Sequence, residues 1–131
     1  MKWACGRDGD NCYLDHRVVK FEAFNGCFPN PKMSFTDLDA ICEIGGRFLV
    51  QEWKQNGHLP DGQRILLERL SRRSDFRAVV VDGDPMYMSV KSFAPVIDGE
   101  VCAVVRADLE DLRAYVKRWA HWAYGLKQEG R

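Results

Sequence analysis

Two short apolar runs stand out in the pattern of hydrophobic and polar positions along the chain. Residues 48–50 follow a Gly-Gly dipeptide at positions 45–46, and residues 76–81 form the second run. Short apolar runs between turn residues are typical of strands that are buried on both faces. A Gly-Gly dipeptide supplies the positive φ angles of a tight hairpin. The pattern therefore predicts a hairpin over residues 34–54, with its turn at the two glycines, and a buried strand over residues 76–81.

Apolar residues at helical spacing predict three helices. The first covers residues 14–24 and ends at Asn25-Gly26, because glycine is favoured just after a helix. The second takes Asp61 as its N-cap and lies between the two apolar runs, so a right-handed β-α-β crossover is expected there. The third begins at Asp108, with acidic residues in its first turn. Its predicted buried stripe consists of Leu109, Leu112, Val116, Trp119 and Ala123.

Turn residues predict the remaining elements. Residues 82–85 read Asp-Gly-Asp-Pro and predict a turn. Residues 86–90 and 101–105 are expected to be further strands, with a hairpin turn at residues 98–99. The order is then helix, hairpin, helix, strand, further strands and helix. This order predicts an α/β fold in which helices flank a central mixed sheet.

Length and composition predict one compact domain over residues 1–131. The chain is 46% hydrophobic, which is enough for a proper core. No apolar run approaches eighteen residues and the start lacks the apolar core of a signal peptide, so we expect no membrane span and a cytoplasmic location. Nineteen basic and nineteen acidic residues cancel. A nucleic-acid partner would therefore require that basic residues be segregated from acidic ones.

The cysteines indicate a reducing compartment, because the chain has five of them and no secretory signal. Cys5, Cys12 and Cys27 lie in the first thirty residues, which begin with an irregular lead, and His16 lies among them. These residues could form part of a Zn²⁺ site, although their spacing differs from the C-x₂₋₄-C of common structural zinc modules. Ordinary free thiols are the alternative interpretation.

Charged residues gather on the predicted hairpin. Strand side chains alternate between faces, so Asp37 and Asp39 share one face of the first strand, and Glu52 and Lys54 share one face of the second. Three carboxylates beside one ammonium at the end of a buried strand are costly unless a divalent cation lies among them. The alternative is a solvated sheet face with a cross-strand ion pair, which would contribute less than ~1 kcal/mol. The apolar run that precedes Glu52 favours the cation site.

The spacing of Asp39 and Glu52-Trp53-Lys54 resembles the D…ExK signature of the PD-(D/E)XK nuclease superfamily. The resemblance covers roughly residues 34–70. This segment is similar to small phage and bacterial members of the superfamily. It implies a restriction-endonuclease-like core with the element order αβββαβ. It also implies a metal-dependent DNA nuclease that hydrolyses the backbone by metal-activated water. The alternative is a catalytically silent module of the same fold, such as a phage-type inhibitor or accessory protein, that binds DNA or protein.

The resemblance also assigns roles to residues. Asp39 and Glu52 would bind Mg²⁺ or Mn²⁺ together with the backbone carbonyl of Trp53. Lys54 would lie near the attacking water and counter charge on the scissile phosphate. Asp37 would bind a second metal or orient a water, or it could be the main ligand in place of Asp39.

A second group of candidates follows the hairpin. Gln63 resembles the glutamine of the QxxxY motif found in one branch of the superfamily, but Leu67 replaces the aromatic residue. Gln63 is therefore either a substrate-positioning residue or an ordinary residue of the first helical turn. Arginines of the same helix are the nearest sources of phosphate contacts, or else form a solvated face. These arginines are Arg64, Arg72 and Arg73.

The last predicted helix mixes aromatic and basic residues. Tyr115, Trp122 and Tyr124 lie beside Arg118 and other basic residues. Such a surface either binds nucleic acid or packs against the sheet or a second subunit. A homodimer that uses exposed tryptophans is a further expectation, since it would bring two sites to two strands of DNA.

Overall fold

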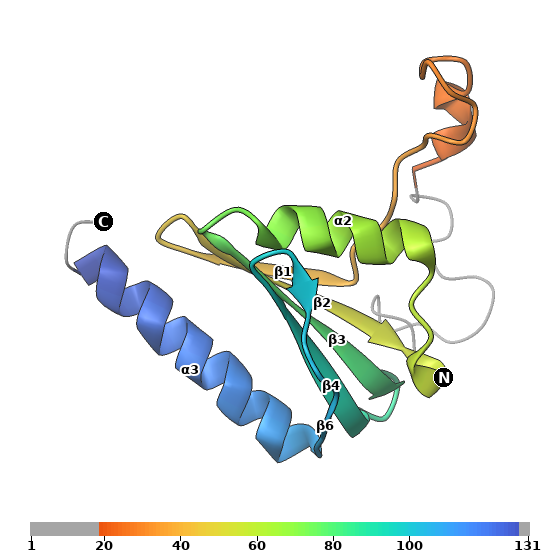
Figure 1. The fold of residues 1–131 in the computed structure, drawn as a ribbon. Helices are drawn as coiled ribbons and strands as arrows, with labels where there is room; N and C mark the ends of the chain where they lie inside the picture. Colours follow the sequence, from red (N-terminus) through yellow and green to blue (C-terminus); the bar gives the residue numbers. More distant parts are fainter. Residues whose placement is uncertain (1–18, 129–131) are drawn as a thin grey trace. The chain divides into compact units, whose positions relative to one another are not determined.

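The computed structural model describes residues 19–128 and divides the chain into two compact units, one ending at Asp37 and one beginning at Leu38 (Figure 1). The described part of the first unit contains one short 3-10 helix, η2 (Phe21–Phe24). Phe35 gathers three aromatic rings around it, with centroid distances of 5.7 Å to Phe21, 5.3 Å to Phe24 and 5.7 Å to Phe28.

The predicted helix over residues 14–24 is wrong in its described part, and residues 14–18 lie outside the described residues. Of residues 19–24, only Phe21–Phe24 are helical, and Asn25 follows as the C-cap before Gly26, whose φ is 87°. A short helix is stable mainly when one of its faces packs against a core, and none of these four residues is buried. Its phenylalanines contact Phe35 instead of forming a helical stripe.

The second unit is built on a mixed sheet with strand order β1-β2-β3-β4-β5 and with β6 paired to β4. The hairpin strands β1 and β2 are antiparallel, and β2 is parallel to β3, as the predicted crossover requires. The strands are β1 (Ala40–Ile44), β2 (Arg47–Lys54), β3 (Phe76–Asp84), β4 (Ser89–Ile97), β5 (Glu100–Val101) and β6 (Val105–Arg106). The helical elements are η3 (Gln55–Gly57), α2 (Asp61–Ser71) and α3 (Leu109–Gln128).

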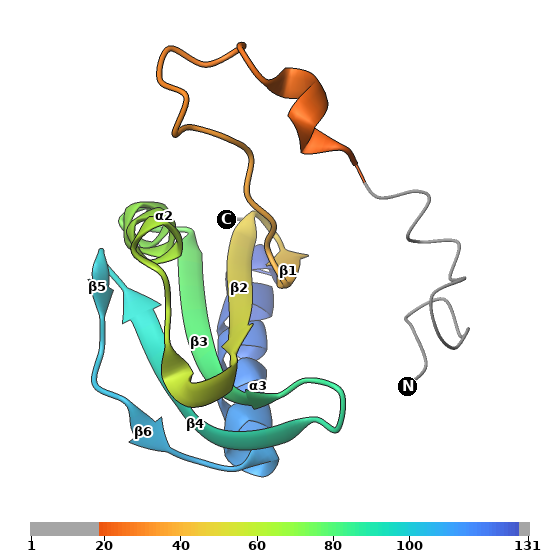
Figure 2. The same cartoon turned by 90° about the vertical axis from the view of Figure 1, so that its right-hand side faces the viewer.

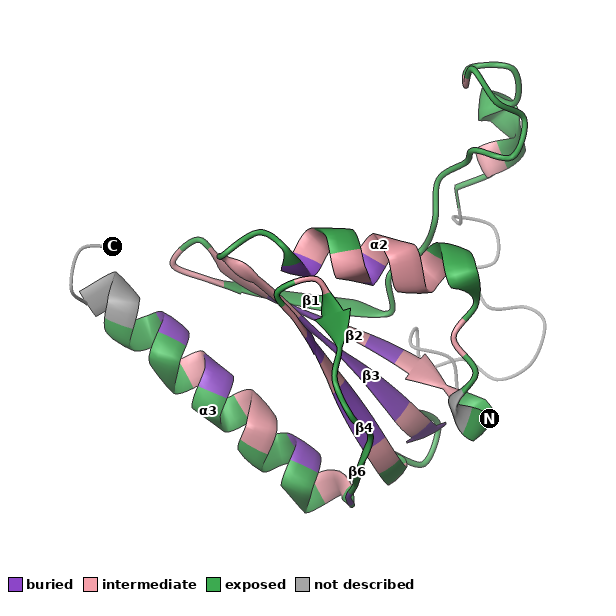
Figure 3. Ribbon diagram, in the orientation of Figure 1, coloured by how far each residue is buried: buried purple, intermediate pink, exposed green. Residues whose placement is uncertain are grey.

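Helices α2 and α3 cover opposite faces of this sheet (Figures 1 and 2). On the α2 face, Leu67 packs among strand residues, and on the α3 face the helix contributes three buried residues. The α2-face cluster is Val50, Leu67, Ala78, Val80 and Val96. The α3-face clusters are Val79, Val81, Phe93, Ala107 and Leu112, and then Leu49, Trp119 and Ala123. Burial therefore follows both faces of β2 and β3 (Figure 3), which confirms the predicted central strands and the stripe of the last helix.

The α/β fold with a mixed sheet flanked by helices is confirmed. Two strands precede α2 among the described residues and the other strands follow it. The finer αβββαβ order stays a prediction. No helix within residues 19–128 is long and apolar enough to cross a membrane.

Two of the three predicted turns are confirmed. Gly45 and Gly46 have φ values of 58° and 85°, and Asp98 and Gly99 have φ values of 53° and 88°. Pairs of positive φ angles are typical of the type I′ turns that match the twist of a hairpin. Both turns connect antiparallel neighbours, β1 to β2 and β4 to β5.

The predicted turn at residues 82–85 is wrong, because β3 continues through Asp84 and the chain turns at residues 85–88. The register shifts between Asp82 and Gly83. A Cβ at Gly83 would collide with the carbonyl oxygen of Ser89 on the next strand. The glycine thus permits a close strand approach at a bulge and does not form a turn. The strand expected from residue 86 begins only at Ser89.

The start of α3 agrees with its predicted cap. The backbone N–H of Asp111 donates to Asp108 Oδ1 at 2.9 Å, and the N–H of Asp108 donates to Asp111 Oδ2 at 3.0 Å. This reciprocal pair has the geometry of a capping box. The hydrogen bond from the Asp111 backbone lowers the pKa of Asp108. By contrast, Asp61 is the first residue of α2 and Pro60 takes the cap position, so the predicted Asp61 cap is wrong.

Candidate functional site

Asp39 and Glu52 meet where the β1–β2 ladder ends. The last backbone pair joins Ala40 to Gln51. Beyond it, the N–H of Asp39 donates to Glu52 Oε1 at 3.0 Å, and the N–H of Trp53 donates to Asp39 Oδ2 at 2.7 Å. Side-chain oxygens therefore replace backbone carbonyls as acceptors. The Asp39 carboxylate accepts from the backbone of Trp53, and the Glu52 carboxylate accepts from the backbone of Asp39. The first strand of the predicted hairpin is shorter than expected, because β1 begins at Ala40, so Asp37 and Asp39 precede the strand and do not share a face of it.

Glu52 is a buried carboxylate, with only 2% of the residue exposed. It lies on the α2 face with Val50, since residues two apart in a strand share a face, and it is registered with Val80 of β3. Lys54 Nζ lies 3.7 Å from Glu52 Oε2. A buried charge is tolerated only when it has such partners. Glu52 has two, the Asp39 N–H and the Lys54 ammonium.

The structure adds Asp82, which the sequence analysis assigned to a turn. Asp82 of β3 is registered with Lys54 of β2 and with Ser92 of β4. Its Oδ1 is shielded from solvent and has no hydrogen-bond partner in the described part of the chain. Two signals in the sequence bear on this position. Val80 and Asp82 are two apart, so Asp82 continues the same strand face beyond the buried run. The β-α-β pattern also predicts that β3 lies parallel to β2.

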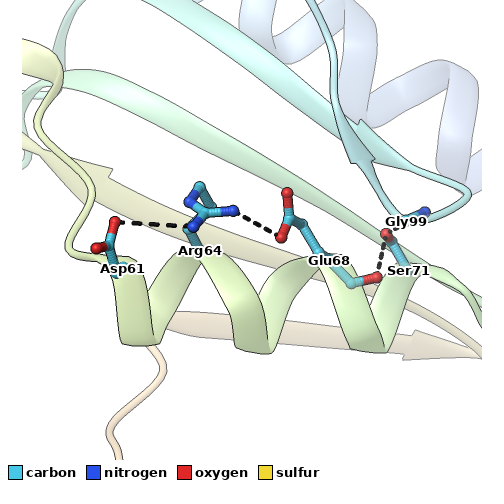
Figure 4. Close-up of polar contacts among 5 residues, drawn as sticks. All are labelled: Asp61, Arg64, Glu68, Ser71 and Gly99. Atoms are coloured by element: carbon cyan, nitrogen blue, oxygen red, sulfur yellow. Dashed lines mark hydrogen bonds and ion pairs between the residues drawn. The ribbon is translucent and has the colours of Figure 1, made fainter.

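The α2 candidates divide between the two ends of the helix. Gln63 is half-buried near the start, and its Oε1 is shielded from solvent without a partner among residues 19–128. Arg64 Nη2 lies 3.7 Å from Asp61 Oδ1, and its Nη1 lies 2.9 Å from Glu68 Oε1 (Figure 4). These carboxylates already neutralise Arg64, so it is a weaker phosphate ligand than the sequence alone indicates.

Arg72 and Arg73 follow the end of α2 and are exposed. The next strand begins at Phe76, whose N–H donates to the carbonyl of Arg73 at 3.1 Å. These arginines therefore lie near the beginning of β3, whereas Lys54 and Asp82 lie toward the ends of β2 and β3. The structure does not bring them together with Asp39 and Glu52.

Trp53 contributes its backbone to the site, and its side chain points to the other face of the sheet. The indole Nε1 donates to Gln51 Oε1 at 2.9 Å, and the ring packs against the α3-face cluster. Asp37 is the last residue of the first unit, and its side chain is exposed.

The donor set of Asp39 and Glu52 fits a hard divalent cation. Mg²⁺ is typically held by one or two carboxylates, with waters and substrate phosphates completing the shell. No group of three or more His, Cys, Asp or Glu side chains able to hold a metal is found within residues 19–128. Of the predicted zinc ligands, Cys27 is an exposed free thiol, and Cys5, Cys12 and His16 lie outside the described residues.

The resemblance to the PD-(D/E)XK superfamily rests on this chain alone, because no protein-family model, curated protein or solved structure matched it. The features that support the resemblance are the hydrogen-bonded Asp39 and Glu52 and the neighbouring Lys54. All three belong to one compact unit.

Proposed function

We propose that the chain is a metal-dependent phosphodiesterase that hydrolyses the DNA backbone and responds to DNA structure rather than sequence. One observation carries the proposal. The carboxylates of Asp39, which directly precedes β1, and of Glu52 on β2 are linked through backbone hydrogen bonds, and Lys54 lies beside Glu52 at the end of a central strand with an apolar middle. A structural ion pair does not need a third charged group in such a place, whereas phosphodiester hydrolysis uses all three.

Each residue has a distinct part in this proposal. Asp39 and Glu52 would hold Mg²⁺ or Mn²⁺ through their carboxylate oxygens, with the Trp53 carbonyl as a third protein ligand. A bound cation of this kind supplies Lewis acidity and lowers the pKa of water. Lys54 would then place its ammonium against the phosphate and stabilise the negative charge that develops there. Its contact with Glu52 Oε2 keeps the ammonium at the site before DNA binds.

The hydrogen bonds between the strands would supply positioning. Because the N–H of Trp53 holds Asp39 and the N–H of Asp39 holds Glu52, neither carboxylate can move without disturbing the other. Pre-organised ligands of this kind avoid reorganisation during the reaction. Gln63 remains a secondary candidate for positioning substrate, since its buried Oε1 lacks a partner in the described chain.

A cleavage assay tests the proposal. Purified protein is incubated with Mn²⁺ or Mg²⁺ and labelled linear, single-stranded, flapped and four-way DNA, with an EDTA control. We expect metal-dependent cleavage that falls about 100-fold or more in Glu52→Gln and in Lys54→Ala. Gln51→Ala is the matched control, because Gln51 precedes Glu52 on the same strand and contacts Trp53 on the other face.

Two results would contradict the proposal. Cleavage that survives in folded Glu52→Gln would remove the carboxylate site from the chemistry. Binding of metal without cleavage of any DNA would favour the alternative, a nuclease-fold module that acts by binding alone.

A further inference from the structure

Arginine and aromatic side chains converge on the α3 face, away from the carboxylates. The guanidinium carbon of Arg47 lies 4.8 Å from the centre of the Trp122 ring, and that of Arg77 lies 5.4 Å from it. The guanidinium carbon of Arg118 lies 6.0 Å from the centre of the Tyr115 ring. We call these five residues the arginine–tryptophan patch.

The patch draws its residues from three elements. Arg47 begins β2, Arg77 lies near the start of β3, and the other three belong to α3. A surface pocket of about 290 Å³ opens beside four of them, and Arg47 is not part of its lining. It is lined by Arg77, Ile97, Tyr115, Arg118, Trp119 and Trp122. Trp122 is 39% exposed, so part of its indole is open to a ligand.

The positive charge of the patch is not neutralised by described carboxylates. Arg64 and Arg113 form ion pairs with acidic neighbours on their own helices, at 2.9 Å and 3.8 Å. Arg47, Arg77 and Arg118 form no ion pair with a carboxylate of residues 19–128, and Arg47 and Arg77 instead donate to backbone carbonyls. In a chain of zero net charge, two such arginines that line one pocket, with Arg47 over the Trp122 ring beside it, are a local excess that favours an anionic ligand.

The surroundings of Tyr115 agree with this arrangement. Burial raises the pKa of the Tyr115 hydroxyl, and the positive charges of Arg77 and Arg118 oppose that rise. The two guanidiniums therefore act on the same part of the pocket from different elements.

We propose that the arginine–tryptophan patch binds single-stranded nucleic acid, with phosphates held by the arginines and a base stacked on the exposed indole or on a guanidinium plane. Planar fork donors suit phosphate oxygens, and exposed aromatic and guanidinium surfaces suit unpaired bases. An acidic peptide would match the charge but not the stacking surfaces.

The patch and the carboxylates lie at opposite ends of β2 and on opposite faces of the sheet. Along β2, the five residue steps from Arg47 to Glu52 span roughly 17 Å. Binding at the patch does not depend on hydrolysis at Glu52. If the proposed function also holds, the patch would hold a single-stranded flank several nucleotides away from the cleaved bond.

Fluorescence anisotropy of a fluorescein-labelled oligothymidylate tests the patch. The full chain is used in EDTA, so that cleavage and its possible failure do not enter the result. We expect Arg77→Gln and Trp122→Ala each to weaken binding about tenfold or more, and Trp122→Phe to retain most of it. Arg113→Gln removes the same charge from α3 outside the patch and should change binding less than twofold.

Competition identifies the ligand. Unlabelled oligothymidylate should displace the probe more effectively than a duplex of equal length, free thymidine monophosphate or polyglutamate. Equal losses of affinity in Arg77→Gln and Arg113→Gln would overturn the proposal. Displacement of the probe by polyglutamate as effectively as by oligothymidylate would also overturn it. If circular dichroism shows that Trp122→Ala is unfolded, the comparison of binding by Arg77→Gln and by Arg113→Gln decides the test alone.

Discussion

The two faces of β2 carry different chemistry along the same strand. Toward α2, Val50 is followed by Glu52 and Lys54, and toward α3, Leu49 is followed by Gln51 and Trp53. Each face is apolar in the middle of the sheet. Each face carries charge at only one end of β2. The α2 face has acidic groups and Lys54 at the end of the strand, and the α3 face has arginines at its beginning.

This difference teaches how a chain with no net charge can offer two charged sites. The carboxylates and the arginines are separated by an apolar layer, so neither group neutralises the other. On the α2 face the charges are held by hydrogen bonds to strand N–H groups. On the α3 face they are held by aromatic rings. The first arrangement suits a fixed cation site, and the second suits a ligand that replaces solvent on exposed rings.

Core truncation on both faces should give the largest effect on stability. Leu67 is fully buried on the α2 face and Leu112 is 3% exposed on the α3 face. Leu67→Ala and Leu112→Ala should each lower the free energy of unfolding by about 3 kcal/mol, from lost burial and the cavity that remains. Urea unfolding measures both. A loss of unfolding free energy below about 1 kcal/mol on one face would show that this face is loosely packed and that the two faces are not equally apolar cores.

Asp82 should oppose the stability of the α2 face. Its Oδ1 is shielded without a partner among the described residues, and such a group costs about 1–3 kcal/mol. Asp82→Ala should therefore raise the free energy of unfolding by about 1 kcal/mol. Urea unfolding of the variant and of the unaltered protein checks this. Reduced stability in the variant would mean that Asp82 has a partner in solution, and Lys54, its register partner on β2, is one candidate.

The cap of α3 should give the smallest effect. Because the pKa of Asp108 is lowered in the folded state, its contribution to stability is present above the unfolded pKa and is lost as the pH falls through the folded pKa. Thermal melts of the protein and of Asp108→Asn should therefore differ at neutral pH and converge in acid. A difference that persists in acid would assign the effect to something other than ionisation.

Local patterns were sufficient to predict most of the second unit. The apolar runs predicted β2 and β3, Gly45-Gly46 and Asp98-Gly99 predicted one turn each, and Asp108 predicted the start of α3. Each of these signals lies within a few residues of the feature that it predicts. The pairing of Asp39 with Glu52 could also be predicted, because a tight hairpin fixes which residues face each other.

Features that depend on distant segments were missed. Asp82-Gly83-Asp84 has the composition of a turn, and only the carbonyl of Ser89 on the neighbouring strand shows why the glycine is required. The arginine–tryptophan patch was missed in part because Arg47 and Arg77 reach Trp122 from strands far away in the sequence. The helix predicted over residues 14–24 shows the opposite error, because its described part has a local helical pattern but no buried residue to hold a helix in place.

The crossover through α2 has a consequence for the order in which the site can assemble during folding. Asp39 and Glu52 are 13 positions apart and are joined by a hairpin, so their contact closes a short loop. Asp82 comes into register with Lys54 only when β3 has aligned in parallel with β2 after the α2 crossover. Contacts that close longer loops cost more entropy and form more slowly. The carboxylate pair is thus a local product of one hairpin, and the rest of the sheet is assembled around it.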